Sequence, residues 1–333
     1  MDSISYNLLK HTGKYRSLKE ESFLQKETTK KALILVTAFI ENGLWFQIKV
    51  GAQSFREFLS GLGFDVYILS FIPEMEQFIQ NPYEKDVSFH EIVFTHFPNF
   101  HTRISNKYEE IHYITHSYGS TLTTCFLLNS TSVQKNVKSF ISIAGVYKLA
   151  MPHFMRLILE KFLTYMLSRS FHYLPMNNLK PLQKIPYLSE GVDRILKIFP
   201  INQINPIFNA NNVDSKAFLQ ALTGGGSSNE TVEAAVTLFG LLTNWQPKNN
   251  ELKSVALIDF SQNLGKFNYP ILMLVGEKDV LTTPKNCQEY GYNLVKSERK
   301  KLIILPNTGH QDVMAPRDPS LLRNHIRDWL LSF

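Results

Sequence analysis

The sequence predicts an α/β protein with a mostly parallel central sheet, flanked by helices, and a helical insertion between two of its strands. Short runs rich in Val, Ile and Leu indicate strands buried on both faces, and most are followed by helix-like sequence, as in parallel sheets. A long helix-rich stretch then interrupts this alternation. The runs expected to form strands are Ala32–Thr37, Asp65–Ser70, Ile111–Thr115, Phe140–Ala144, Pro270–Val275 and Lys301–Leu305.

The spacing of apolar residues predicts a helix over Ser54–Leu62, stopped by Gly63, and another over Ser120–Asn129. The interrupting stretch is too long for a loop, so we expect a subdomain there. Because it follows the carboxyl end of a strand, we expect it to cover the functional edge of the sheet as a lid. The expected division is an N-terminal segment (1–30), a core (31–145 and 266–333) and a helical lid (146–265).

Composition limits the possible classes of protein. The chain has 333 residues, 44% hydrophobic and 19% charged, which is ordinary globular composition. Its two cysteines, Cys125 and Cys287, do not suggest a disulfide framework or a zinc cluster, and they fit a reducing compartment. The first 30 residues are largely polar and do not resemble a signal peptide, and no apolar run approaches the length of a membrane span. We therefore expect a cytoplasmic protein.

The formal charge of +6 has two interpretations. One is attraction to an anionic membrane or to nucleic acid, and the other is a solvated surface. Because the basic residues are scattered, a solvated surface is favoured and no nucleic-acid partner is expected. The apolar stretch Phe154–Leu167 also has alternatives: packing of the lid onto the core, an apolar wall for a lipid-like acyl chain, or a face that contacts a membrane peripherally.

The turn Thr115-His116-Ser117-Tyr118-Gly119 lies between a predicted strand and a predicted helix. A serine on such a turn has an exposed hydroxyl and lies beside the N–H groups that begin a helix, and a nucleophile needs both. Small residues two positions before and after the serine relieve crowding in this turn. Gly119 meets this requirement, whereas Thr115 is larger. The alternative role for Ser117 is a helix N-cap.

A nucleophilic serine needs a histidine base that is oriented by a carboxylate. Asp279 follows the predicted strand PILMLV, and His310 follows KLIIL, so both should lie at the same edge of the sheet as Ser117. Glu277 competes with Asp279 as the acid, and Asp279 could instead be a simple turn residue. His116 is a weaker candidate base than His310, because side chains at i and i+1 point apart.

An oxyanion hole requires two backbone N–H groups. We expect one from Tyr118, directly after Ser117, and the other from Phe39 in the loop after the first strand, with Ala38 as the second choice. No cofactor is implied, because the sequence contains neither a phosphate-binding glycine loop nor an HExxH-type metal motif.

The order Ser…Asp…His and the strand–turn–helix around Ser117 resemble the α/β-hydrolase fold superfamily. Within it, the acid lipase group of neutral-lipid and cholesteryl-ester hydrolases is similar. The stretch VSFHEIVFTHFP followed by IHYITHSYGSTL resembles the segment through their nucleophile, and Phe64-Asp65-Val66-Tyr67 resembles their Gly-Tyr-Asp-Val-Trp strand. Gly309-His310-Gln311-Asp312 is similar to their His-x-Asp loop, and 224–242 is similar to part of their lid. The resemblance implies an esterase or lipase reaction.

The chain departs from that group at two places. Thr37-Ala38 replaces the His-Gly pair after the first strand, and Thr115 replaces the first glycine of the turn. The leading hypothesis is a serine hydrolase that cleaves carboxylic esters with an apolar, lipid-like acyl group through an acyl-enzyme. The alternatives are an acyltransferase with the same site and a catalytically inactive binding protein on a hydrolase fold. The oligomeric state is left open by the sequence.

Overall fold

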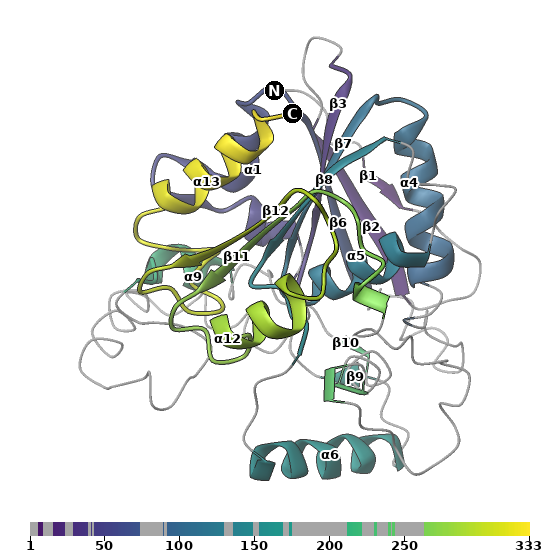
Figure 1. Ribbon diagram of the computed structural model, residues 1–333, viewed down its shortest axis with the longest axis vertical. Helices are drawn as coiled ribbons and strands as arrows, with labels where there is room; N and C mark the ends of the chain where they lie inside the picture. Colours follow the sequence, from purple (N-terminus) through teal and green to yellow (C-terminus); the bar gives the residue numbers. More distant parts are fainter. Residues whose placement is uncertain are drawn as a thin grey trace.

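The computed structural model has an eight-stranded sheet with helices on both faces (Figure 1). The structure describes residues 6–8, 16–23, 29–38, 41, 43–73, 89, 92–129, 136–148, 153–168, 173–174, 212–221, 230–231, 239–240, 242–243 and 263–333. In spatial order the strands of the sheet are β1 (Tyr6–Leu8), β2 (Arg16–Phe23), β6 (Asp65–Pro73), β3 (Lys31–Val36), β7 (Glu110–His116), β8 (Val137–Ile143), β11 (Ile271–Gly276) and β12 (Lys300–Leu305).

The six strands from β6 to β12 are parallel, and they coincide with the six apolar runs that were predicted as strands. The mostly parallel α/β fold is therefore confirmed. The two strands β1 and β2 were not predicted. They pair antiparallel with each other, and β2 pairs antiparallel with β6, so residues 6–8 and 16–23 extend the sheet at that edge.

The helices lie mainly between the strands along the chain. Those beside the sheet are α1 (Phe55–Ser60), α4 (Phe97–Ser105), α5 (Tyr118–Asn129), α12 (Pro284–Cys287) and α13 (Ser320–Leu330), with the short helical turns η1 (Gly43–Phe46), η2 (Ile92–His96) and η6 (Gln288–Tyr292). The helix predicted over Ser54–Leu62 is α1. Ser54 caps it, because its hydroxyl accepts the Glu57 N–H and the Glu57 carboxylate accepts the Ser54 N–H.

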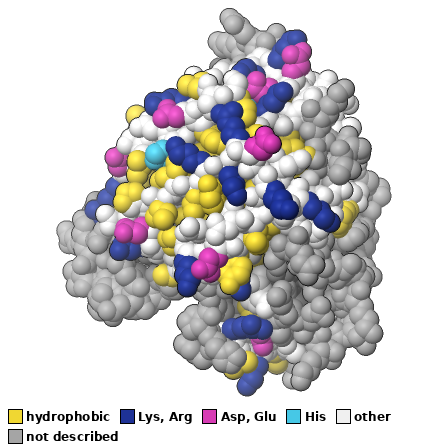
Figure 2. Space-filling view, viewed as in Figure 1, with side chains coloured by type: hydrophobic (Ala, Val, Ile, Leu, Met, Phe, Trp, Pro, Cys, Tyr) yellow, Lys and Arg dark blue, Asp and Glu magenta, His cyan; other side chains and the backbone are white. Residues whose placement is uncertain are grey.

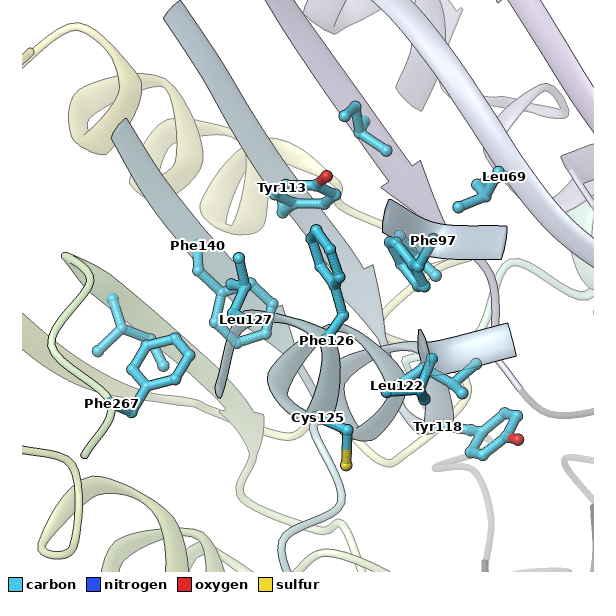
Figure 3. Close-up of a cluster of buried hydrophobic side chains, with 14 of the residues drawn as sticks. Leu69, Phe97, Tyr113, Tyr118, Leu122, Cys125, Phe126, Leu127, Phe140 and Phe267 are labelled. Atoms are coloured by element: carbon cyan, nitrogen blue, oxygen red, sulfur yellow. The ribbon is translucent and has the colours of Figure 1, made fainter. Parts of the chain in front are cut away.

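Alternate side chains of the strands fill two apolar cores, one on each face of the sheet. Ile34 and Val36 of β3 join the core beneath α4 and α5, whereas Leu33 and Leu35 join the core beneath α1 and α13. Figure 3 shows the first core, in which the ring of Phe126 on α5 packs against Tyr113 of β7 and Phe97 of α4. All of α5 from Tyr118 to Leu127 is buried, which holds its first turn firmly against the sheet.

The predicted insertion 146–265 is described only in parts. Its helices and strands are α6 (His153–Ser168), α9 (Ser215–Ala221), and the antiparallel pair β9 (Tyr173–Leu174) and β10 (Glu230–Thr231). Outside the insertion, β4 (Lys49–Val50) and β5 (Gln53–Ser54) form a second small antiparallel pair. Figure 1 shows α6 apart from the helices that flank the sheet. Within the described part of the chain, no helix combines the length and apolar character needed to cross a bilayer.

The basic residues on the face shown in Figure 2 are interspersed with acidic side chains and with small apolar areas. Among the described residues, basic side chains also pair with acids, as in the Arg156–Glu160 and Lys31–Glu110 ion pairs. This arrangement is typical of a solvated surface.

Candidate active site

The turn that carries Ser117 joins the end of β7 to the start of α5. Ser117 has a φ of +50°, a left-handed conformation that is uncommon for a residue with a side chain. Its N–H donates to the Ile143 carbonyl at 2.9 Å, and its carbonyl accepts the Ser120 N–H at 3.0 Å. These backbone bonds on both sides hold the strained conformation, which is a recurrent property of functional sites.

Gly119 is required by the packing of this turn. A Cβ at Gly119 would lie 2.6 Å from the carbonyl oxygen of Thr37 and 2.7 Å from that of Val36. Both obstacles are backbone atoms, one at the end of β3 and one in the residue after it, and they cannot move aside easily. The second small residue of the turn thus allows α5 to approach the end of β3.

Thr115, the residue that departs from the glycine pattern, fits without crowding the turn. Its side chain is fully buried, and its hydroxyl donates to the Ile141 carbonyl at 3.2 Å and lies 2.7 Å from the Ser120 hydroxyl. Ser142 donates to the same Ser120 oxygen at 3.1 Å. Thr115 therefore joins a buried group of hydroxyls that links β7, α5 and β8.

The three predicted side chains of the site come together at the carboxyl edge of the sheet. The Nε2 atom of His310 lies 2.8 Å from Ser117 Oγ, and its Nδ1 atom lies 2.8 Å from Asp279 Oδ2. All three residues are buried. The arrangement is a continuous hydrogen-bond chain from hydroxyl to imidazole to carboxylate.

Asp279 is held by several donors besides His310. Its Oδ1 accepts the N–H groups of Leu281 and Thr282, and its Oδ2 accepts the Thr282 hydroxyl at 2.6 Å. Burial alone would raise the pKa of Asp279, but the His310 contact and these donors lower it, so the carboxylate is ionised.

Glu277, the competing acid, lies elsewhere. Its carboxylate accepts the Asn307 N–H at 3.0 Å and is about half exposed. Gly276, directly before it, has no room for a side chain, because a Cβ would lie 2.2 Å from the Thr308 carbonyl oxygen. The loops after β11 and β12 are thus packed backbone to backbone, which places Asp279 beside His310.

Asp312 and Asn212 support the loop that carries His310. Both carboxylate oxygens of Asp312 face the Gly309 N–H, at 2.9 and 3.0 Å, and the Asn212 side-chain amide donates to Asp312 at 2.7 Å. Val213 pairs with Pro316 as an isolated bridge. A part of the insertion is therefore bonded directly to the base-carrying loop, which the sequence pattern did not indicate.

Two predicted oxyanion donors are described by the structure and one is not. Tyr118 is the first residue of α5, where N–H groups lie at the helix start. The Ala38 N–H donates to the Glu41 carboxylate at 3.3 Å. Phe39 lies outside the described residues.

His116, the weaker candidate base, points away from Ser117 Oγ toward Glu41. Its Nδ1 lies 3.1 Å from Glu41 Oε2, and its Nε2 lies 3.2 Å from the His310 carbonyl oxygen. Sequence reasoning missed Glu41 and Gln311, whose amide also donates to Glu41. The position of Glu41 directly after the apolar run Ala38–Ile40 was the only signal for it.

Several solved structures have a similar fold. A soluble variant of monoglyceride lipase from Saccharomyces cerevisiae superposes with a TM-score of 0.63 at 13% identity, covering 100% of this chain and 95% of that chain. A monoacylglycerol lipase from Paleococcus ferrophilus gives 0.57 at 13% identity, with 95% and 98% covered. A putative lipase from Acinetobacter baumannii gives 0.56 at 16% identity, with 99% and 91% covered.

No protein-family model and no curated protein matches the sequence. At identities this low, the structural similarity establishes the fold alone. The chain has the α/β-hydrolase fold, as the sequence predicted.

Proposed function

We propose that the protein is a serine hydrolase that cleaves carboxylic esters. The observation that carries the proposal is the hydrogen-bond chain Ser117–His310–Asp279, with Ser117 held in a left-handed turn at the start of α5. Three partners from three separate loops meet within hydrogen-bond distance, in the arrangement that activates a serine. The names of the similar structures, two monoacylglycerol lipases and a putative lipase, support the same reaction class.

In the proposed mechanism, Ser117 Oγ attacks the ester carbonyl while His310 Nε2 accepts its proton. Asp279 holds the Nδ1–H tautomer of His310 and stabilises the imidazolium. His310 then protonates the leaving alcohol, and an acyl-enzyme on Ser117 results. Water, deprotonated by His310, attacks this acyl group and releases the acid.

The negative charge on the carbonyl oxygen needs two N–H donors. We assign one to Tyr118 and the other to Phe39. The Ala38 N–H is directed to Glu41, which favours Phe39 over Ala38 as the second donor.

We further propose a preference for apolar acyl groups, with residues 146–265 acting as a lid. The support comes from α6, where Leu157, Ile158, Phe162 and Tyr165 are exposed although they are large and apolar. These side chains could line an acyl site or contact a membrane surface peripherally. The small-molecule partner would then be an ester or lipid.

A fluorophosphonate probe tests the catalytic proposal directly. It should label the wild type and not Ser117→Ala. Ser120→Ala is a matched control, because Ser120 is a buried serine three residues further along, and this variant should still be labelled. A folded wild-type protein that is not labelled would contradict the proposal.

Hydrolysis of p-nitrophenyl esters of increasing chain length tests the acyl preference. We expect kcat/KM to rise beyond acetate and to reach its maximum at a longer chain. A maximum at acetate, with no hydrolysis of long chains, would refute the apolar preference while leaving the esterase reaction intact.

A further inference from the structure

A second buried histidine–carboxylate pair lies beside the proposed triad. His116 is fully buried and Glu41 is 5% exposed. The pair is joined by Nδ1 of His116 and Oε2 of Glu41 at 3.1 Å, while Nε2 of His116 faces the backbone carbonyl of His310 at 3.2 Å. The rings of His116 and His310 are 5.6 Å apart.

The partners of the His116 ring determine its charge. A carboxylate oxygen and a backbone carbonyl oxygen accept hydrogen bonds and donate none. A neutral imidazole has one N–H and could satisfy only one of them. With Glu41 ionised, both contacts are made only if both nitrogens carry protons, and His116 is then a buried imidazolium paired with the Glu41 carboxylate.

Glu41 gathers donors from three parts of the site. Its Oε2 accepts from His116 and from the Ala38 N–H, and its Oε1 accepts from the Gln311 amide. Ala38 belongs to the loop after β3, His116 to the end of β7, and Gln311 to the loop after β12. One carboxylate therefore connects the proposed oxyanion loop, the nucleophile turn and the base-carrying loop.

The same strand carries a contrasting pair at its other end. His112 is also buried, with Nε2 at 2.8 Å from Glu110 Oε1, but its Nδ1 faces the Ser139 hydroxyl at 2.7 Å. Because a hydroxyl can donate as well as accept, His112 needs only one proton to satisfy both contacts. The two pairs consist of the same residue types, and they differ in the group that the second ring nitrogen of the histidine contacts.

The directions of the pKa shifts agree with this difference. Burial alone would lower the pKa of His116, but the Glu41 charge and the hydrogen bonds outweigh the effect of burial, and the pKa is raised. Burial likewise opposes ionisation of Glu41, yet His116, Gln311 and Ala38 lower its pKa. For His112, burial prevails over Glu110 and the pKa is lowered.

We propose that His116 and Glu41 are positioning residues that lock the oxyanion loop to the base-carrying loop through a buried ion pair. The inference rests on the esterase function proposed above. The groups that act on His116 are Glu41, the ring and carbonyl of His310, and the charge of Asp279. Loss of either partner's charge weakens the Glu41–His116 contact, and the loops that Glu41 joins through Ala38 and Gln311 then shift relative to Ser117.

The kinetic test compares Glu41→Gln and His116→Gln with Glu110→Gln and His112→Gln on one p-nitrophenyl ester. We expect the first two to lower kcat by about 100-fold, the usual effect of misplacing reacting groups by about 1 Å, with KM nearly unchanged. Glu41→Asp, which keeps the charge, should recover part of the rate. The control pair should keep the wild-type kcat after any loss of stability is accounted for.

The pH profile separates positioning from a simple structural role. In the wild type, kcat should fall at alkaline pH as His116 loses its proton. Glu41→Gln removes the charge that raises the pKa of His116, so this alkaline limb of the pH profile should move to lower pH. The limb should not move in Glu110→Gln. Unchanged kcat and an unchanged limb in Glu41→Gln, in a protein that the fluorophosphonate still labels, would overturn the inference and leave the esterase function standing.

Nitrogen-15 NMR of histidine-labelled wild type tests the charge independently of activity. At neutral pH, the resonances that disappear in His116→Gln should show two protonated ring nitrogens, whereas those of His112 should show a neutral tautomer. A neutral His116 would overturn the proposal. A protein that is not labelled by the fluorophosphonate would remove the esterase function and, with it, the positioning role.

Discussion

The backbone of Gly119 on α5 lies so close to that of Thr37 after β3 that a Cβ on Gly119 would be 2.6 Å from the Thr37 carbonyl oxygen. This contact connects the start of the nucleophile helix to the beginning of the proposed oxyanion loop. The two segments to which the proposed mechanism assigns oxyanion binding are therefore packed backbone to backbone.

Gly119→Ala should destabilise the protein and impair the site together. The added methyl meets backbone atoms, and overpacking of this kind costs about 1–3 kcal/mol. Urea denaturation should show this loss, and the rate of fluorophosphonate labelling should fall. Gly61→Ala is the control, since Gly61 has a helical φ of −64° and no contact below 3.3 Å. Equal stability of the two variants would contradict the packing argument.

Asp279→Asn should abolish most activity without unfolding the protein. The amide nitrogen can face His310 Nδ1 and favour the wrong tautomer, a change that lowers kcat by about 10⁴-fold in serine proteases. Glu277→Gln, two residues earlier, should retain kcat within about twofold, because its carboxylate contacts Asn307 instead. The measurement is ester hydrolysis with thermal denaturation as the folding check. A comparable loss in both variants would argue against Asp279 as the acid.

Thr115→Gly restores the usual small residue of the turn, yet it should weaken the protein. The substitution removes a buried hydroxyl that donates to Ile141 and leaves its Ser120 partner with one contact fewer, which costs about 1–3 kcal/mol. Thr115→Val keeps the side-chain volume, so its loss of stability should measure the contribution of the hydroxyl alone. Denaturation midpoints and labelling rates test this. Faster labelling of Thr115→Gly would mean that Thr115 crowds the turn.

Asn212→Ala should reduce activity although Asn212 lies in the insertion, far from Ser117 in sequence. Its amide holds Asp312, which in turn accepts the Gly309 N–H beside His310. A hydrogen bond to a charged group contributes about 1.5–3 kcal/mol to the free energy of unfolding, and Asn212→Ala loses one. Asp312→Ala should have the larger effect, because it leaves the Gly309 N–H without its acceptor. Wild-type kcat in both variants would show that this loop needs no such support.

The stability contributed by the Glu41–His116 pair should depend on pH in both directions. Glu41 has a pKa below its ordinary 4.5, so its contribution is present above that pH and lost as pH falls through the folded value. His116 has a pKa above its ordinary 6.5, so its contribution is present below that pH and lost as pH rises through the folded value.

The difference in unfolding free energy between wild type and His116→Gln should therefore be largest between pH 4.5 and pH 6.5, the ordinary pKa values of the two groups, and smaller at more acidic or more alkaline pH. Urea denaturation across this range measures it. A difference that grows steadily toward alkaline pH would be inconsistent with a charged His116.

The parallel strands were predictable because each is a short run of apolar residues long enough to cross the core. The strand β2 was not, since its sequence RSLKEESF is as polar as an exposed segment. It forms because β6 offers an edge with unpaired backbone groups, a property of the assembled sheet and not of the residues 16–23 themselves.

The same limit applies to the candidate site. Ser117, Asp279 and His310 each follow a strand, so topology alone predicted their proximity. Glu41 and His116 meet across 75 residues, and Asn212 and Asp312 across 100, through loops whose paths depend on packing. Asp312 stood in the His-x-Asp resemblance, but no local pattern indicated its partner or those of Glu41, which explains why these contacts were missed while the proposed triad was not.

The pairing of β2 with β6 has a practical consequence for work with this protein. The register matches eight residues of β2 with eight of β6, from Arg16–Pro73 to Phe23–Val66. A shortened chain that begins at Lys31 would retain every residue of the proposed triad but would leave the long edge of β6 open. Open edges recruit strands from other molecules, so we expect such a chain to aggregate at concentrations where the full chain does not.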